Sequence, residues 1–233
     1  MKECNECLIT EDLVSNSFDK NGICEFCNSF KKHRKYFDNS DLHSRYILKK
    51  ISREIRNKTK KDKFNCIIGI SGGVDSSYVA YIAKKMSLRV LLVHFDNGWN
   101  SKVAVKNIYN LAKYSKFTFK NYVIDWDEFK SLQRSFIKAG VVDVEMLTDH
   151  AIAAILIETA KKEKIKFILS GDNFPTENGM PKDWTWLKND KANITDINKK
   201  FENIEIKKFP MLGIYEYLYF LFFSKVKVIN VLN

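Results

Sequence analysis

Residues 66–85 have the sequence CIIGISGGVDSSYVAYIAKK, in which an apolar run is followed by a glycine turn and then by a helix-forming segment. An apolar run of this length, bounded by a turn, is typical of a strand buried in a parallel sheet. Glycines directly after such a strand let the backbone turn sharply and expose successive N–H groups at the start of the next helix. Exposed N–H groups of this kind bind phosphate oxygens, so the segment predicts a nucleotide site.

The rest of the chain after residue 62 alternates between apolar strands and amphipathic helices. Such alternation predicts a parallel sheet with helices on both faces, which is the α/β doubly wound class. We predict helices over 76–86, 101–114, 127–138 and 148–164, the last with Thr148 or Asp149 as its N-cap. The predicted strands, in chain order, cover 64–70, 88–95, 117–124, 165–170 and 203–209.

Four of the five cysteines form two CxxC pairs, Cys4 with Cys7 and Cys24 with Cys27. Two CxxC turns present four thiolates to one ion, which is the tetrahedral arrangement that Zn²⁺ prefers. The segment DKNGIC before the second pair supplies a tight turn. A site with four protein ligands is closed to substrate, so we expect a structural N-terminal zinc ribbon.

The formal net charge of +11 raises the question of a nucleic-acid partner. The lysines, however, are spread over many predicted helix faces, where they are usually solvated surface. We therefore do not predict nucleic acid as a partner.

No stretch is long and apolar enough to span a bilayer. The nearest, residues 211–223, carries Glu216 and is expected to be a core helix. The N-terminal residues MKECNECLIT have no apolar h-region of a secretory signal, so we expect a cytoplasmic protein.

The loop SGGVDSS offers hydroxyl and backbone donors together with one carboxylate. It lacks the lysine of a Walker A motif and is too short for a Rossmann fingerprint. Asp75 is predicted to hold Mg²⁺ or a magnesium-bound water. The predicted phosphate ligands for ATP are Ser71, Gly72, Gly73, Ser76 and Ser77.

This loop, between an apolar strand and a helix, resembles the PP-loop of the N-type ATP pyrophosphatase superfamily. The resemblance implies cleavage of ATP between the α and β phosphates, adenylation of an oxygen, and displacement of AMP by a nucleophile. It also implies the strand order 3-2-1-4-5, in which the strands that precede SGGVDSS and SGDNF are neighbours. Ligands bind at the carboxyl ends of such strands.

Further segments resemble the N-acetyl sugar amidotransferases of the WbpG and PseA type. These segments include VHFDNGWNSKVAVKNI, YVIDWDEFK, TDHAI, SGDNFPTENGMPKDW and KVKVINVLN. The resemblance implies conversion of an acetamido group of a bacterial surface-glycan sugar to an acetamidino group, with release of AMP and pyrophosphate. It implies an N-acetylated nucleotide sugar as substrate and a partner glutaminase with a cyclase-like subunit as the source of ammonia. Family members continue beyond the point where this sequence ends, so we expect a C-terminally short copy.

The resemblance also implies roles for residues outside the loop, each with a plain structural alternative. An Asx-turn, a helix N-cap beside a hydrogen-bonded histidine, a packed histidine or a solvated lysine would explain them equally well. Predicted nucleotide-site residues are His94, Asp96, Asn97, Gly171 and Asn173, and predicted catalytic residues are Asp75, Asp149, His150, Asp172 and Lys182.

Two other functions fit parts of the sequence. A PP-loop tRNA thiolase would also carry an N-terminal CxxC ribbon and a basic chain, but such enzymes need cysteines near the catalytic core. Only Cys66 lies there, within a predicted strand where an inert thiol is expected. A zinc-ribbon binding module with a degenerate nucleotide domain is disfavoured by the intact SGGVDSS.

These inferences divide the chain into four parts. Residues 1–32 form the zinc ribbon and 33–62 a basic helical connector. Residues 63–215 form the PP-loop domain, and residues 216–233 begin a C-terminal helical segment.

Overall fold

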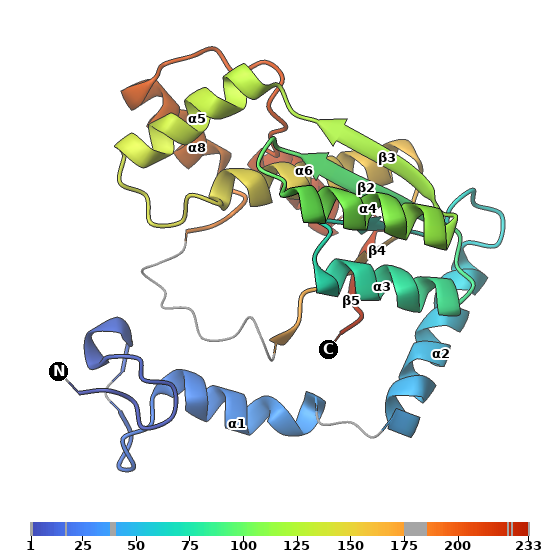
Figure 1. Ribbon diagram of the computed structural model, residues 1–233, viewed down its shortest axis with the longest axis horizontal. Coiled ribbons are helices and arrows are strands. Elements are labelled where there is room, and N and C mark those ends of the chain that lie inside the picture. Colours follow the sequence, from blue (N-terminus) through green and yellow to red (C-terminus); the bar gives the residue numbers. More distant parts are fainter. Residues whose placement is uncertain are drawn as a thin grey trace.

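Five short strands form a single parallel sheet in the order β3-β2-β1-β4-β5 (Figure 1). The computed structural model describes residues 2–16, 18–37, 41–174, 186–222, 224 and 226–232. The strands are β1 (Cys66–Gly69), β2 (Val90–Asp96), β3 (Thr118–Val123), β4 (Phe167–Ser170) and β5 (Lys227–Asn230). The sheet and its helices confirm the predicted α/β doubly wound class.

Alternation along the strands produces two separate cores, because successive side chains of a strand point to opposite faces. Ile67 of β1 and Leu91 of β2 belong to one core, whereas Ile68 and Leu92 belong to the other. All four side chains are at least 97% buried. Strands buried on both faces explain why the sequence shows continuous apolar runs rather than polar alternation.

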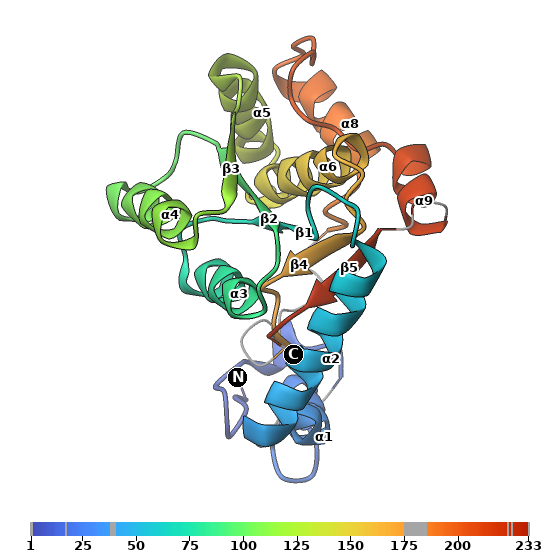
Figure 2. The ribbon, with the colours of Figure 1, turned by 90° about the vertical axis from the view of Figure 1, so that its right-hand side faces the viewer.

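One face of the sheet is covered by α2 (Asp41–Lys58), α3 (Val74–Lys85) and α4 (Lys102–Ser115). Figure 2 shows α3 and α4 together on that side of the sheet. Ile55 of α2 is fully buried in this core, which fixes the C-terminal half of α2. The N-terminal half of the same helix exposes Leu42 and Tyr46, although their spacing predicts an apolar face.

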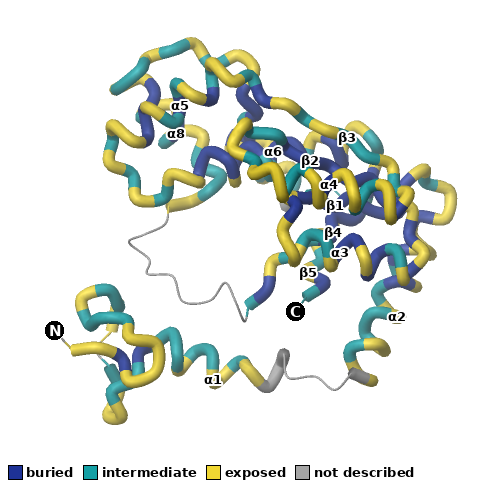
Figure 3. The backbone as a smooth tube through the Cα atoms, in the orientation of Figure 1, coloured by how far each residue is buried: buried dark blue, intermediate teal, exposed yellow. Residues whose placement is uncertain are grey.

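The opposite face is covered by α5 (Trp126–Lys138) and α6 (Met146–Lys162), and α8 (Lys191–Phe201) packs on α5 (Figure 2). Phe129 and Phe136 of α5 are fully buried there. Burial colouring shows the same arrangement, with dark strands inside and yellow outer helix faces (Figure 3).

The fifth strand is not where the sequence suggested. Residues 203–209 were predicted as a strand but lie outside any helix or strand, with Phe209 packed into the α5–α6 core. The strand beside β4 is instead formed by residues 227–230, within the segment predicted to begin a helical extension. The sheet therefore runs past the expected boundary at residue 215.

The apolar segment after residue 210 forms α9 (Ile214–Phe222), but it is not the core helix that we predicted. Tyr215 is 83% exposed and Phe222 is 73% exposed, whereas Phe220 packs against the α5–α6 core. Among the described residues, no helix combines the length and the apolar character needed to cross a membrane.

The N-terminal segment contains a short 3₁₀ helix, η1 (Glu11–Leu13), and α1 (Glu25–Phe37). The predicted tight turn is present: the Asp19 carboxylate accepts hydrogen bonds from the backbone N–H groups of Asn21 and Ile23, at 2.8 and 2.9 Å. Gly22 has a φ of +72°. The second CxxC pair opens directly into α1, which continues past the predicted domain boundary at residue 32.

Candidate functional site

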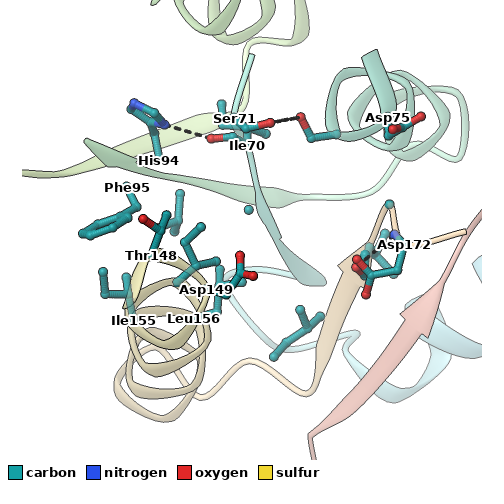
Figure 4. Close-up of a pocket in the computed structure, with 18 of the residues that line it drawn as sticks. Ile70, Ser71, Asp75, His94, Phe95, Thr148, Asp149, Ile155, Leu156 and Asp172 are labelled. Carbon is teal, nitrogen blue, oxygen red and sulfur yellow. Dashed lines mark hydrogen bonds between the residues drawn. The ribbon is translucent and has the colours of Figure 1, made fainter. Parts of the chain in front are cut away.

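A cavity of about 380 Å³ lies at the carboxyl ends of β1, β2 and β4, with α6 as its remaining wall. Its volume is in the range of small-ligand sites. Figure 4 shows Ser71 and His94 on one side, Thr148 and Asp149 of α6 opposite them, and Asp172 beside them. The predicted site residues that line the cavity are Ser71, Asp75, Ser76, His94, Asn97, Asp149, Gly171 and Asp172.

The glycine loop places the N-terminus of α3 at this cavity. Gly72 has a φ of +80°, in the left-handed region that favours glycine, and it lets the chain turn from β1 into the helix. Gly73 is the N-cap residue and has no side chain to cap the first N–H groups of the helix, while its own N–H donates to Ser71 Oγ at 3.4 Å. The first N–H groups of α3 are therefore available to an anion.

Three serines surround this turn. The hydroxyls of Ser71 and Ser76 are 3.4 Å apart, and the Ser71 N–H donates to Ser76 Oγ at 3.3 Å (Figure 4). The Ser77 hydroxyl instead donates to the Gly73 carbonyl at 2.7 Å and does not line the cavity. Ser71 and Ser76 are thus the hydroxyls in reach of a ligand, while Ser77 stabilises the first turn of α3.

The loop packs tightly against α4. A Cβ atom added at Gly72 would lie 2.4 Å from the backbone oxygen of Ala104. The Asn107 side chain also donates a hydrogen bond to the Gly72 carbonyl at 3.1 Å. The helix after β2 therefore fixes the position of the loop after β1.

The loop after β4 closes on the same helix end from the other side. A Cβ atom at Gly171 would lie 3.3 Å from both the backbone carbon and the Cβ of Asp75. Asp172 lines the cavity, whereas Asn173 is buried and does not. The predicted meeting of two loops far apart in sequence is thus present in the fold.

His94 has a buried ring that joins β2 to the start of the glycine loop. Its Nδ1 lies 2.9 Å from the Ile70 carbonyl, which can only accept, so Nδ1 carries the proton. The other nitrogen, Nε2, then accepts from Asn100 Nδ2 at 3.3 Å. With both ring nitrogens hydrogen-bonded to protein groups, His94 fixes the position of the loop.

Asp96 and Asn97 shape the loop after β2. Asp96 accepts from the Gly98 N–H at 3.1 Å and from the Asn100 side chain at 3.0 Å, and it does not line the cavity. Asn97 lines the cavity and donates to the Thr148 hydroxyl of α6 at 3.4 Å. The DNGWN and TDHAI segments therefore meet at the cavity rim.

The helix α6 starts earlier than predicted, with Glu145 rather than Thr148 or Asp149 as N-cap residue. Asp149 is consequently in the helix, where it lines the cavity and forms a 2.7 Å ion pair with Lys188. Asp143 forms a second ion pair with Lys188, at 2.6 Å. Between these carboxylates, Lys188 keeps its charge: burial lowers its pKa, but the two hydrogen bonds raise it to above its usual range.

His150 points away from the cavity. Its Nε2 accepts from the Leu212 N–H at 2.9 Å and its Nδ1 therefore donates to the Lys188 carbonyl, also at 2.9 Å. The ring is 1% exposed, and burial lowers its pKa. His150 thus joins α6 to two loops, and we do not assign it a role in proton transfer.

Lys182, with the rest of the segment 175–185, lies outside the described residues. Three residues that line the cavity or hold its loops in place were not predicted from the sequence, namely Asn100, Asn107 and Lys188. Asn100 ends the DNGWN segment at the carboxyl end of a strand, so its position carried a usable signal. Asn107 and Lys188 carried none, because a polar residue on a helix or loop is ordinarily solvated.

The four paired cysteines gather into one cluster whose sulfur atoms all lie within 4.8 Å of one another. Cys4 Sγ is 4.0 Å from Cys27 Sγ, and Cys7 Sγ is 3.6 Å from Cys24 Sγ. Four Zn–S bonds of about 2.3 Å at tetrahedral angles separate the sulfurs by about 3.8 Å. The cluster therefore has the dimensions of a tetrahedral metal site.

The thiols differ sharply in acidity. Burial alone would raise the pKa of Cys4, but hydrogen bonds from the N–H groups of Cys7, Glu6 and Cys24 lower it to about 6. Cys66, in β1, has no such donors, and burial raises its pKa to about 12. Cys66 is therefore an inert packed thiol.

The N-terminal cluster contacts the β4 loop through aromatic rings. Phe174 stacks on Phe30 of α1 at 6.4 Å between ring centroids, and His33 meets it edge-on at 5.5 Å. Phe174 follows Asp172 by two residues, so α1 covers the end of a loop that lines the cavity.

Residues 65–165 match the family model for the queuosine biosynthesis protein QueC. The match covers β1 to α6 and includes the glycine loop. The match and the strand order make this part of the chain similar to the PP-loop ATP pyrophosphatases. No curated protein sequence matches the chain significantly.

Several solved structures are similar in outline. An NH3-dependent NAD synthetase from Campylobacter jejuni is 18% identical over 56% of this chain and 57% of its own, with a TM-score of 0.44. An NMN synthetase from Francisella tularensis is 14% identical over 72% of this chain and 73% of its own, with a TM-score of 0.45. The U34-tRNA thiolase NcsA from Methanococcus maripaludis, whose structure contains a 4Fe-4S cluster, is 17% identical over 100% of this chain and 68% of its own, with a TM-score of 0.41.

Proposed function

We propose that the chain is an ATP-dependent amidotransferase that converts an acetamido group of a nucleotide-linked sugar into an acetamidino group. The observation that supports an adenylating site best is the junction of two loops at the N-terminus of α3. Ser71 lies in the loop after β1 and Ser76 in the first turn of α3, while Gly171 and Asp172 lie in the loop after β4. In a doubly wound sheet, the carboxyl ends of such neighbouring strands are where nucleotides bind.

In this proposal the N–H groups at the start of α3 and the hydroxyls of Ser71 and Ser76 bind the phosphates of ATP. Asp75, the second residue of α3, faces the cavity and holds Mg²⁺. ATP supplies the adenylyl group, which turns the amide oxygen from a poor leaving group into a good one. The amide oxygen displaces pyrophosphate from the α-phosphate; ammonia then adds to the carbon, AMP departs with that oxygen, and the nitrogen loses its extra protons.

The choice of an acetamido sugar rests on the resemblance of two segments, DNGWN and TDHAI, to the sugar amidotransferases. Those segments lie together at the cavity, with Asn97 hydrogen-bonded to Thr148. Asn97 and the ion-paired Asp149 are then placed to orient the amide or the incoming ammonia. Ammonia itself would come from a partner glutaminase.

Zinc is the metal that we assign to the four-cysteine cluster. A closed set of four thiolates leaves no position for substrate, so its role would be to stabilise residues 2–37. Through Phe30 and Phe174 that stabilisation extends to the loop that carries Asp172.

The alternative is a tRNA-modifying PP-loop enzyme, which the net charge of +11 and the N-terminal cysteines favour. Against sulfur transfer stands the state of Cys66. It is the one cysteine of the sequence outside the N-terminal cluster, and it is fully buried with a raised pKa. A persulfide or an iron–sulfur cluster would need reactive thiols at the cavity.

The test measures AMP and pyrophosphate formed from Mg-ATP and ammonium with a panel of acetamido nucleotide sugars or with bulk tRNA. We expect AMP only with a sugar, and mass spectrometry should show replacement of O by NH in that sugar. AMP that depends on tRNA, or that forms without any acceptor, would refute the proposal in favour of the alternative.

Asp75→Asn should abolish AMP formation without changing the melting temperature. The matched control is Asp127→Asn, because Asp127 is also exposed and is also the second residue of its helix, α5, but it does not line the cavity. Equal losses in both variants would contradict the role of Asp75 in holding Mg²⁺.

A further inference from the structure

A groove of about 310 Å³ lies between the loop after β2, α5 and the start of α6. It is distinct from the nucleotide cavity but shares a wall with it. Asn97 lines the nucleotide cavity and accepts a hydrogen bond from the Trp99 N–H at 3.1 Å, while Trp99 lines the groove. On α6, Glu145 lines the groove and Thr148, less than one turn later, lines the cavity.

The Trp99 side chain in the groove is 66% exposed, yet it is held in place. Its indole N–H donates to Gln133 Oε1 at 2.9 Å, and its ring meets Trp126 edge-on with centroids 5.7 Å apart. Gly98 makes this possible, because a Cβ there would lie 2.9 Å from the Trp126 ring. A solvent-facing aromatic ring that is fixed by a hydrogen bond and by a second ring is ready to stack on a ligand at little entropic cost.

Apolar and basic groups surround the ring. Ile137 and Val144 are 67% and 44% exposed on the groove wall. Lys130 and Arg134 lie on the same wall, one turn apart on α5. Arg134 is 3.5 Å from Glu202 with its side chain 56% exposed, and among the described residues no ion pair engages Lys130.

The charge of this wall favours an anionic ligand. Two cations face a single acidic side chain, Glu145, within the groove. A diphosphate next to a ring fits such a wall, since guanidinium and ammonium groups bind phosphate oxygens and an indole face binds an apolar sugar face or a base. A free sugar without phosphate would leave Lys130 without an ion-pair partner among the described residues, whereas Arg134 already pairs with Glu202.

We propose that this groove binds the acceptor substrate, a nucleoside-diphosphate-linked acetamido sugar, with Trp99 against a ring and Lys130 and Arg134 on the diphosphate. The proposal rests on the proposed function and adds the location and charge of the second substrate. An acceptor held there lies directly across Asn97 from the bound nucleotide. Neighbouring sites for the two substrates would supply the proximity that a two-substrate adenylation needs.

The test is direct binding, by calorimetry, of UDP- and dTDP-linked acetamido sugars to the full chain, without ATP turnover. We expect at least one to bind, and both Trp99→Ala and Lys130→Gln to weaken it by about tenfold or more, as for the loss of one stacking or phosphate contact. ATP binding should be unchanged in both variants. The controls are Trp186→Ala, which removes a comparably exposed indole hydrogen-bonded to Asp190, and Lys113→Gln on α4.

The possible binding results distinguish the groove assignment from the proposed function. Binding that is unaffected by both groove variants, or no binding by any member of the panel, overturns the groove assignment, while sugar-dependent AMP formation would still support the proposed function. Binding of a tRNA anticodon-stem oligonucleotide that is lost in both variants would overturn the small-acceptor assignment. If Trp99→Ala lowers the melting temperature, Trp99→Phe provides the second readout, because it keeps a ring and should retain most of the affinity.

Discussion

Gly72→Ala is a direct test of how closely the phosphate loop packs on α4. Gly72 has a φ of +80°, and an added Cβ would lie 2.4 Å from the backbone oxygen of Ala104 and 2.9 Å from its Cα. A backbone oxygen on a hydrogen-bonded helix cannot move aside cheaply. The variant must therefore shift either the loop or the first turn of α4.

The magnitude follows from two separate costs. The left-handed backbone costs alanine about 1 kcal/mol relative to glycine. The overlap with Ala104 adds about 1–3 kcal/mol, as for insertion of a methyl group into a packed site. We expect Gly72→Ala to lower the free energy of unfolding by about 2–4 kcal/mol.

Gly140→Ala is the matched control. Gly140 has a φ of +67°, but an added Cβ there would meet nothing within 4 Å. It therefore carries the backbone cost alone, about 1 kcal/mol. The reduced entropy of the unfolded chain is the same in both variants and cancels in the comparison.

Urea unfolding and calorimetric ATP binding would measure both effects. Gly72→Ala should unfold at a lower urea concentration than Gly140→Ala and should bind ATP more weakly, whereas Gly140→Ala should bind ATP normally. Equal stability and equal ATP affinity in the two variants would refute the close approach of the loop to α4.

Two further predictions concern the metal cluster and pH. Cys24→Ser should abolish tight zinc binding, measured by elemental analysis, and should make residues 2–37 sensitive to protease. The control variant Cys66→Ala should retain zinc. Retention of zinc by Cys24→Ser would contradict the four-thiolate site. Burial lowers the pKa of His150 in the folded chain below the value of about 6.5 that it has in the unfolded chain. The neutral ring therefore adds to the free energy of unfolding above about pH 6.5. This contribution is lost as the pH falls from there toward the folded-state pKa, by up to about 1.4 kcal/mol per pH unit. His150→Gln, measured by urea unfolding between about pH 7.5 and 5.5, should remove this part of the acid sensitivity. An unchanged pH profile would show that folding does not shift the pKa of His150 and would refute the prediction.

Much of the sheet was predictable because its strands are buried on both faces. β1, β2 and β4 follow from apolar runs such as CIIG and VLLVHF, whereas β3, with the sequence TFKNYV, is partly exposed and carries polar residues. β5 was missed because KVIN is short and lies at the sheet edge, where Val228 is 47% exposed. Residues 203–209 were mistaken for it because their alternation has another cause. The Phe209 side chain enters the core, while the backbone N–H groups of Lys207 and Phe209 donate to the Glu128 carboxylate.

Some residues of the candidate site could likewise be predicted from the sequence and others could not. Ser71, Asp75 and Ser76 were predictable, because a glycine loop after a strand determines its own local geometry. His150 and Ser77 were assigned to the site from their neighbours in sequence, but side-chain direction depends on where α6 and α3 begin. The partners of His150 are backbone groups 38 and 62 residues away, so no local pattern could reveal them.

The strand order also has a consequence for the time course of folding. β1, β2 and β3 are consecutive in sequence and adjacent in the sheet, so they can pair as they leave the ribosome. β4 joins β1 on the opposite side only after α5 and α6 have been made, and β5 pairs with it later still. A nascent chain therefore presents a formed glycine loop beside an unpaired edge of β1. The half of the cavity that carries Asp172 is completed last, which makes that edge the point where a stalled or truncated chain is most prone to aggregate.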